Sequence, residues 1–377
     1  MFDKLFEIIF FISAFLYLLF SFFLFTYKKG NRLSNKIFAG FCLLNGLYIM
    51  SDLAYIFRRS VFKVFPPYLD VILESTFFLF GPFLYFYTSS MTRKNFVFKK
   101  VHLVHLIPFF LDFIYRNYRF FVHSNIVAIM VERGYFISYS EVRLRYILME
   151  AQVIIYILAS LFIVYRYRSE LKEIFSSIEK IKLSWLYLVL FGFLAAHLFH
   201  LSKISLTHLT ETWRDILSLS THLGSMLMAA IVVLKGLTQP ELFSGITEGP
   251  SGRKYKKTAL SDEELDRYSG ILIDYMESRK PYLNPALTLG DLARALKIPP
   301  HTVSQVLSLR LKENFYNFIN RYRIEESKRF LSDPSTQKKT ILEILYEAGF
   351  NSKAAFNMAF KKHTGMTPTE YVRARQE

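Results

Sequence analysis

The chain has 377 residues, of which 52% are hydrophobic and 17% aromatic, and its mean hydropathy is +0.23. This composition is too apolar for an ordinary soluble protein, and most of the apolar excess precedes residue 236. The formal charge of +16 at pH 7 suits nucleic acid and anionic lipid equally. The single cysteine, Cys42, excludes an intrachain disulfide and a metal site built from paired thiols.

Apolar stretches long enough to cross a bilayer core, which requires about 20 residues, follow one another through the first part of the chain. The first stretch has no small-residue cleavage site after it, so we expect an uncleaved span and not a signal peptide. The alternative, buried helices of one large soluble core, fits this regular repetition poorly. The seven expected spans are residues 5–27, 37–57, 68–89, 101–115, 146–165, 185–204 and 216–235, the fourth being the shortest.

Basic residues around the first expected span set its orientation. Lys4 precedes the span, whereas Lys28, Lys29, Arg32 and Lys36 follow it. Since basic residues concentrate on the cytoplasmic side, the N-terminus is expected outside. Seven crossings then place the C-terminus in the cytoplasm.

Ionisable side chains in hydrocarbon are costly, so those within the expected spans are candidates for function. They gather in the outer halves of the spans, which suggests an outward-facing polar cavity that binds an unknown small-molecule signal. Its histidines would make the response sensitive to pH between about 5 and 8. The other interpretation, that these groups snorkel to water or pair with one another, stays open. The expected signal-binding residues are Asp52, Glu74, His197, His200 and His222.

Residues 237–257 separate the apolar part of the chain from a polar C-terminal part. This stretch is rich in Gly and Pro and ends in the basic run Arg253-Lys-Tyr-Lys-Lys257. We expect a flexible linker whose basic end lies on anionic lipid, on DNA phosphate or in water. The predicted domains are therefore a seven-span transmembrane sensor domain over 1–236, the linker over 237–257, and a third domain over 258–377.

Helical patterns fill the third domain. Ser261-Asp-Glu-Glu264 matches a capping box, in which a Ser oxygen and a Glu carboxylate each bond the other residue's backbone N–H. A helix is therefore expected from Asp262 to about Arg279, before Pro281 ends it. Residues 315–331 repeat apolar side chains every three to four positions, which predicts a second long helix.

Two helix-turn-helix patterns flank this second helix. The first joins residues 289–296 to residues 300–310, with the small Ala293 where the two helices approach closely. The second joins residues 341–348 to residues 352–363, with Gly349 where the turn needs positive φ.

A set of residues in and between these patterns carries a family signature. The set is Leu289, Asp291-Leu-Ala293, Asn314-Phe, Ile319-Asn-Arg-Tyr-Arg-Ile324, Ile341, Ile344, Ala348-Gly-Phe-Asn-Ser352, Phe356, Ala359-Phe-Lys-Lys362 and Gly365-Met-Thr-Pro-Thr-Glu-Tyr371. It resembles the AraC family of bacterial transcription regulators. The resemblance implies an all-helical domain with two helix-turn-helix motifs that binds double-stranded promoter DNA. The expected fold class is all-α, with a seven-helix transmembrane bundle followed by this AraC-type domain.

The second helix of each motif is expected to present outward-facing side chains to base edges in the major groove. Gln305 can bond an adenine through two atoms. In the second motif Met358 stands where the family usually has a polar or basic residue, and Ala354 cannot bond a base through its side chain. The second motif is therefore expected to dock mainly through phosphates and apolar contact. The expected DNA-binding residues are His301, Thr302, Ser304, Gln305, Ser308, Lys353, Asn357 and Lys361.

Catalytic patterns are absent from the sequence: it has no phosphate-binding glycine loop, no Gly-x-Ser-x-Gly elbow and no His-Glu-x-x-His helix. We expect no enzyme, no cofactor and no metal site. The predicted function is that of a one-component transcription regulator tethered in the bacterial inner (cytoplasmic) membrane, which senses a signal and binds a promoter. Besides DNA and the lipid bilayer, the partners considered are a second copy of the chain and, for an activator, RNA polymerase. The alternative is a transporter-like or receptor-like membrane protein whose helical tail recruits a protein partner.

Overall fold

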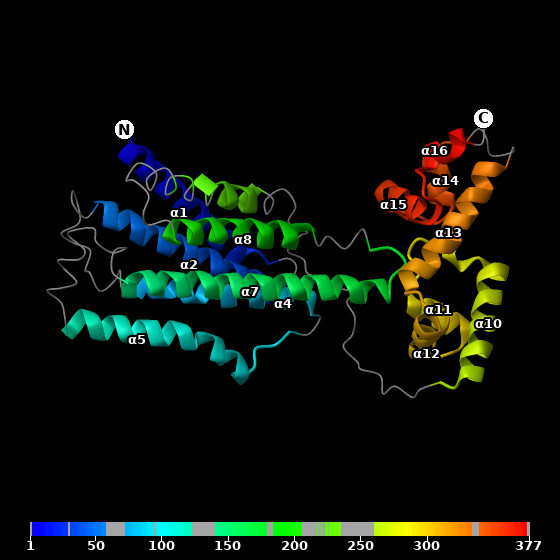
Figure 1. Ribbon diagram of the computed structural model, residues 1–377, viewed down its shortest axis with the longest axis horizontal. Coiled ribbons are helices and arrows are strands. Elements are labelled where there is room, and N and C mark those ends of the chain that lie inside the picture. Colours follow the sequence, from blue (N-terminus) through cyan, green and yellow to red (C-terminus); the bar gives the residue numbers. More distant parts are fainter. Residues whose placement is uncertain are drawn as a thin grey trace. The chain divides into compact units, whose positions relative to one another are not determined.

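The computed structural model describes residues 2–28, 31–57, 72–93, 96–122, 140–178, 184–205, 260–333 and 339–374, with shorter pieces between 217 and 234. The chain folds as two compact units (Figure 1). The N-terminal unit combines Met1–Tyr165 with Leu183–Gly249, and the C-terminal unit combines Arg166–Lys182 with Pro250–Glu377. Within the described residues every regular element is a helix, which confirms the all-α class.

Long apolar helices make up the N-terminal unit. Among the residues that the structure describes, four helices are long and apolar enough to cross a membrane, and they coincide with the first, second, fifth and sixth expected spans. Within the described residues, the third and fourth expected spans each contain a short 3-10 helix followed by an α-helix, and the seventh is helical over residues 226–234. The elements are α1 (Phe2–Thr26), α2 (Arg32–Phe57), η1 (Thr76–Leu79), α4 (Phe80–Thr92), η2 (Lys100–Leu106), α5 (Ile107–Val122), α7 (Ser140–Lys172) and α8 (Ser184–Ser205).

Proline explains why the third expected span is interrupted. Pro82 lies in the first turn of α4 and has no N–H to donate to the carbonyl of Phe78, four residues earlier. The chain is accordingly a 3-10 helix over Thr76–Leu79 before α4 begins. The side-chain amide of Gln152 on α7 donates to the Phe78 carbonyl at 3.1 Å. An interhelical hydrogen bond thus replaces the one that Pro82 cannot form.

Apolar side chains fill the interior of the N-terminal unit and also cover its outside. Inside, Phe38 stacks on Tyr87 with ring centroids 4.4 Å apart, and the indole N–H of Trp185 donates to the Tyr87 hydroxyl at 3.1 Å. On the outside, Phe22 of α1 is 68% exposed and Phe162 of α7 is 64% exposed. A soluble domain rarely exposes so many large apolar side chains on long helices.

Shorter helices build the C-terminal unit, and they lie where the sequence predicted them (Figure 1). Residues 315–332 form the predicted connecting helix, and the two predicted helix pairs lie before and after it. The elements are α10 (Asp262–Arg279), η5 (Pro281–Leu283), α11 (Leu289–Leu296), α12 (Pro300–Gln305), η6 (Val306–Arg310), α13 (Phe315–Ser332), α14 (Ile341–Glu347), α15 (Lys353–Thr364) and α16 (Pro368–Arg373).

The connecting helix α13 contributes to two hydrophobic cores. Phe315 and Phe318 near its start pack with residues of α10, α11 and α12. Ile324, near its middle, packs with residues of α14 and α15 such as Leu345 and Phe356. One helix therefore fixes both helix pairs through the same rigid segment.

Reciprocal caps begin four helices of the C-terminal unit, α10, α11, α14 and α16. The predicted capping box at Ser261 is present, with the Glu264 N–H donating to the Ser261 hydroxyl at 3.2 Å. Thr340 repeats it before α14: the Glu343 N–H donates to the Thr340 hydroxyl at 3.2 Å, and the Thr340 N–H donates to the Glu343 carboxylate at 2.7 Å. These bonds satisfy amides that have no partner inside the helix.

Replacing Thr340 by Val should destabilise α14. This helix is only seven residues long, so the hydrogen bonds of its cap are a large part of those that hold it. The expected loss is about 1 kcal/mol, which corresponds to roughly fivefold faster opening of the helix. Hydrogen exchange of the α14 amides in the full chain would measure it. Thr369→Val, at an exposed position in α16 that caps no helix, is the control and should leave exchange unchanged.

Candidate nucleic-acid interface and polar networks

The first helix pair, α11 and α12, is joined by a tight turn. Lys297 adopts positive φ (56°) at the end of α11, and the Ile298 N–H donates to the Ala293 carbonyl at 3.1 Å. Ala293 and Val303 are both fully buried in the same core, as expected where two helices approach closely. The turn and the core together hold α12 at a fixed angle to α11.

A charge-assisted cap begins α11. The Thr288 hydroxyl donates to the Asp291 carboxylate at 2.7 Å, and this bond is the main reason that the pKa of Asp291 lies below its ordinary value. A carboxyl whose pKa is lowered by folding stabilises the fold above its unfolded pKa. That contribution is lost as the pH falls through the lower folded pKa. The cap is therefore intact at neutral pH.

The outward face of α12 and the following η6 carries four of the five residues predicted there. Ser308 is exposed, and His301, Ser304 and Gln305 are half-buried. Thr302 is only 4% exposed, so its predicted outward orientation is wrong. Helical spacing is the reason: positions 302, 303, 306 and 307 all face the core, whereas 301, 304, 305 and 308 share the opposite face.

The second half of this helix is a π-helix, which the sequence did not predict. Over Val306–Arg310 the hydrogen bonds span five residues, and the Leu311 N–H donates to the Val306 carbonyl at 3.1 Å. The widened turn exposes Ser308 and Arg310, and Arg310 forms an ion pair with Asp266 of α10. Short π segments frequently occur at functional sites. Here it shapes the end of the helix that would enter a groove.

The second helix pair, α14 and α15, turns at Gly349. This residue has φ of +88°, as predicted, and a Cβ added to it would lie 2.4 Å from the Tyr282 carbonyl oxygen. Ser352 then caps α15 by accepting a hydrogen bond from the Ala355 N–H at 3.3 Å. Leu345 is fully buried between the helices, so this large side chain is accommodated in the core.

The outward face of α15 agrees with the sequence prediction. Lys353, Ala354, Met358 and Lys361 are exposed, and Asn357 is half-buried. This face therefore offers two lysines for phosphate contacts around an apolar centre, where Met358 is 59% exposed.

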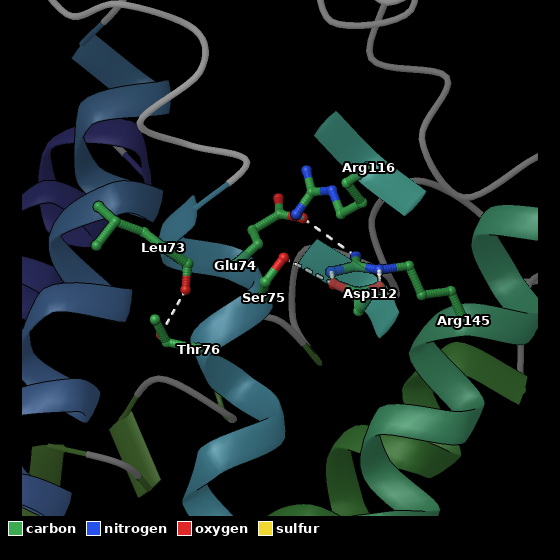
Figure 2. Close-up of polar contacts among 7 residues, drawn as sticks. All are labelled: Leu73, Glu74, Ser75, Thr76, Asp112, Arg116 and Arg145. Atoms are coloured by element: carbon green, nitrogen blue, oxygen red, sulfur yellow. Dashed lines mark hydrogen bonds and ion pairs between the residues drawn. The ribbon is translucent and has the colours of Figure 1, made fainter. Parts of the chain in front are cut away.

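The carboxylate of Glu74, predicted to bind a signal, contacts two arginines (Figure 2). It lies 2.6 Å from Arg116 of α5 and 3.2 Å from Arg145 of α7. Arg145 also donates through Nε and Nη2 to the two oxygens of Asp112, at 2.6 and 2.9 Å, and the Ser75 hydroxyl donates to Asp112 at 2.8 Å. Neither arginine was predicted as part of a site, because nothing in their spacing in the sequence indicates a pairing with a distant helix.

His197 and His200 of α8 meet on one carboxylate. Their Nδ1 atoms lie 2.8 and 2.7 Å from the two oxygens of Glu150, a buried residue of α7. His197 and His200 thus pair with another ionisable group of the expected spans, whereas Glu74 pairs with arginines just outside them. The side chain of Asp52 and the whole of His222 lie outside the described residues. No cluster of three or more metal-ligating side chains occurs in the part of the chain that the structure describes.

Comparison with known proteins places the similarity in the C-terminal unit. Residues 292–374 match a family model described as "Helix-turn-helix domain". The melibiose operon regulatory protein of Escherichia coli (strain K12) is 30% identical over 92 residues, which are 24% of this chain and 30% of that protein. The probable transcriptional regulator LumQ of Photobacterium leiognathi is 19% identical over 171 residues, 45% of this chain and 66% of LumQ.

A third relative is an uncharacterized HTH-type transcriptional regulator in the cgkA 5' region of Pseudoalteromonas carrageenovora. It is 29% identical over 99 residues, 26% of this chain and 55% of that protein. The similarity thus spans less than a third of the Escherichia coli protein, and no solved structure matches the chain. These relatives support the resemblance to an AraC-family DNA-binding domain, and residues 292–374 form a helix-turn-helix domain similar to those of transcriptional regulators.

Proposed function

We propose that the protein is a membrane-tethered one-component transcription regulator whose C-terminal unit binds promoter DNA sequence-specifically. The observation that carries this proposal is the arrangement of two helix pairs on α13, with the polar face of α12 and the lysine-bearing face of α15 both directed outward. A major groove admits such a helix, and tandem motifs can occupy two successive grooves.

The outward side chains of the two pairs suggest different roles in DNA binding. The α12 face carries Gln305, Ser304 and His301, all of which can bond base edges, so we assign sequence readout mainly to this helix. The α15 face carries Lys353 and Lys361, which suit phosphates. Binding energy from α15 would then be largely independent of sequence.

Membrane tethering is proposed from the apolar exterior of the N-terminal unit. Exposed Phe and Leu side chains line long helices that also have an apolar interior, as expected for helices surrounded by lipid. With seven spans and the N-terminus outside, the protein would lie in the bacterial inner membrane with its C-terminal unit in the cytoplasm. A second copy of the chain and RNA polymerase are the protein partners that such a regulator would use.

The proposal is tested with the full chain in lipid nanodiscs and a library of fragments of its own genome. Specific fragments should be retained, and their affinity should fall steeply between about 50 and 200 mM salt because phosphate contacts release counterions. Retention of proteins but of no DNA fragment would favour the alternative, a receptor-like or transporter-like protein whose tail recruits a protein partner.

Gln305→Ala is expected to weaken binding to the preferred site by about 1–3 kcal/mol and to relax the preference at one base position. The reason is the loss of a two-point hydrogen bond to a base edge. Selection of binding sites from a random DNA library would show the relaxed position. Thr369→Ala in α16 is the control, and an unchanged site profile for Gln305→Ala would reject this role for the side chain.

Signal sensing is proposed for the Glu150 network, where two histidines share one buried carboxylate. Histidine changes charge between about pH 5 and 8, whereas glutamine keeps a hydrogen-bond donor without titrating. His200→Gln should therefore flatten the dependence of promoter output on external pH. His102→Gln, outside this network, should leave that dependence intact. Equal pH profiles for the parent and His200→Gln would remove the sensing role.

A further inference from the structure

A short segment that follows α7 pairs with the DNA-binding part of the C-terminal unit. Phe175 and Thr288 form an antiparallel β-bridge, the one pairing of extended backbone within the described residues. The Ser176 N–H donates to the Leu287 carbonyl at 3.3 Å, and the Leu289 N–H donates to the Ile174 carbonyl at 2.9 Å. We name Glu173–Ser177 the strap.

Side chains reinforce this backbone pairing. The Ser176 hydroxyl donates to the Leu287 carbonyl at 2.6 Å. Arg323 of α13, which is 0% exposed, donates to the Ser176 carbonyl and to the Ser176 hydroxyl, each at 3.1 Å. The same guanidinium donates to the carbonyls of Tyr282 at 2.7 Å and Asn284 at 2.9 Å. A buried guanidinium needs such acceptors, and the strap supplies part of the set.

The strap contacts the α11–α12 pair at the residue that begins α11. Thr288 is the N-cap of α11, and the turn at the other end of α11 holds α12. At its own N-terminal end the strap follows α7 directly, and α7 is one unbroken helix from Ser140 to Lys172. The same helix carries Arg145 and Glu150, the centres of both polar networks in the N-terminal unit.

We propose that the strap is a coupling element, through which a displacement of α7 is transmitted to α11 and hence to the orientation of α12. It gives the chain a connection to its DNA-binding unit in addition to the linker over residues 237–257. This inference rests on the proposed function, because a signal can change DNA binding only by favouring one of two states of the protein. Arg323 and the backbone of Leu287–Leu289 then form an intramolecular docking site for the strap.

The docking is tested by cross-linking the full chain in nanodiscs. The substitutions Phe175→Cys and Thr288→Cys are combined with Cys42→Ser, and a protease site is inserted in the linker. Residues 175 and 288 form a pair without direct hydrogen bonds between them, whose Cα atoms lie about 4.5 Å apart in antiparallel strands, within reach of a disulfide. After mild oxidation and cleavage, the two fragments should run as one band until reductant is added.

The control replaces Thr288→Cys by Thr340→Cys, which also modifies a threonine N-cap of the C-terminal unit but one that bonds Glu343 of α14. This pair should give two separate bands. If the 175–288 pair also gives two bands, or if both pairs cross-link equally, the strap does not dock and the proposal is wrong.

Coupling is tested by the rate of the 175–288 cross-link. Glu150→Gln disturbs the network on α7 and should change this rate about fivefold or more, the lower end of typical coupling between sites. His200→Gln provides a second, milder disturbance, and Ile155→Val, at an exposed position of α7, should leave the rate unchanged. If neither network variant changes the rate, the strap only stabilises the C-terminal unit and the coupling is rejected. Loss of DNA binding in the parent protein would reject the proposed function while leaving the cross-link intact.

Discussion

Replacing Gly349 by Ala is expected to destabilise the α14–α15 pair by about 3 kcal/mol or more, from two separate causes. The first is its φ of +88°, which residues with a Cβ rarely adopt. The second is contact: the new Cβ would lie 2.4 Å from the Tyr282 carbonyl oxygen and 2.9 Å from the Leu283 Cα, both of them backbone atoms. The turn would therefore have to move away from the segment before α11.

Two other glycines separate these causes. Gly365 also has positive φ (78°) but nothing within 4 Å of its added Cβ, so Gly365→Ala should show the backbone strain alone, about 1–2 kcal/mol. Gly270 lies in α10 with open space around it, so Gly270→Ala should stabilise that helix by about 0.5–1 kcal/mol. Hydrogen exchange of the C-terminal unit in the full chain would rank the three. If Gly349→Ala proved no worse than Gly365→Ala, the close contact with Tyr282 would be refuted.

The helices of the C-terminal unit could be predicted because their signals are local. A capping threonine or serine with an acidic residue three positions later marks where α10, α11, α14 and α16 begin, and the apolar repeat shows which face is buried. The error at Thr302 shows the limit of this reasoning. The turn before α12 sets which positions of the helix face the core. A shift of one position therefore moves a side chain from the outward face to the core.

Contacts between distant segments could not be predicted in this way. Ser176 and Arg323 are 147 positions apart, and neither belongs to a motif that predicts a contact with the other. The same is true of Arg145, which meets Glu74 and Asp112 from another helix. The carboxylates and histidines could be recognised from the sequence as costly in an apolar environment. Their partners, two arginines and a shared glutamate, could not.

Arg323→Met is expected to lower the free energy of unfolding of the C-terminal unit by about 3 kcal/mol or more, since each buried acceptor left without a donor costs about 1–3 kcal/mol. The guanidinium joins the strap, the segment before α11 and the α14–α15 turn, where its Cζ lies 5.7 Å from the centre of the Phe350 ring. Its removal should therefore loosen both helix pairs together. Hydrogen exchange of α13 amides in the full chain should accelerate about a hundredfold.

The neighbouring Arg321 supplies a control of equal size and charge. Its side chain is 40% exposed and pairs with Glu313 at 3.2 Å, and exposed ion pairs contribute about 1 kcal/mol or less. Arg321→Met should change exchange by no more than about fivefold. Arg323→Lys keeps the charge but cannot donate to three segments at once, so it should retain only part of the lost stability. Equal effects of Arg323→Met and Arg321→Met would mean that the buried guanidinium does not hold these segments together.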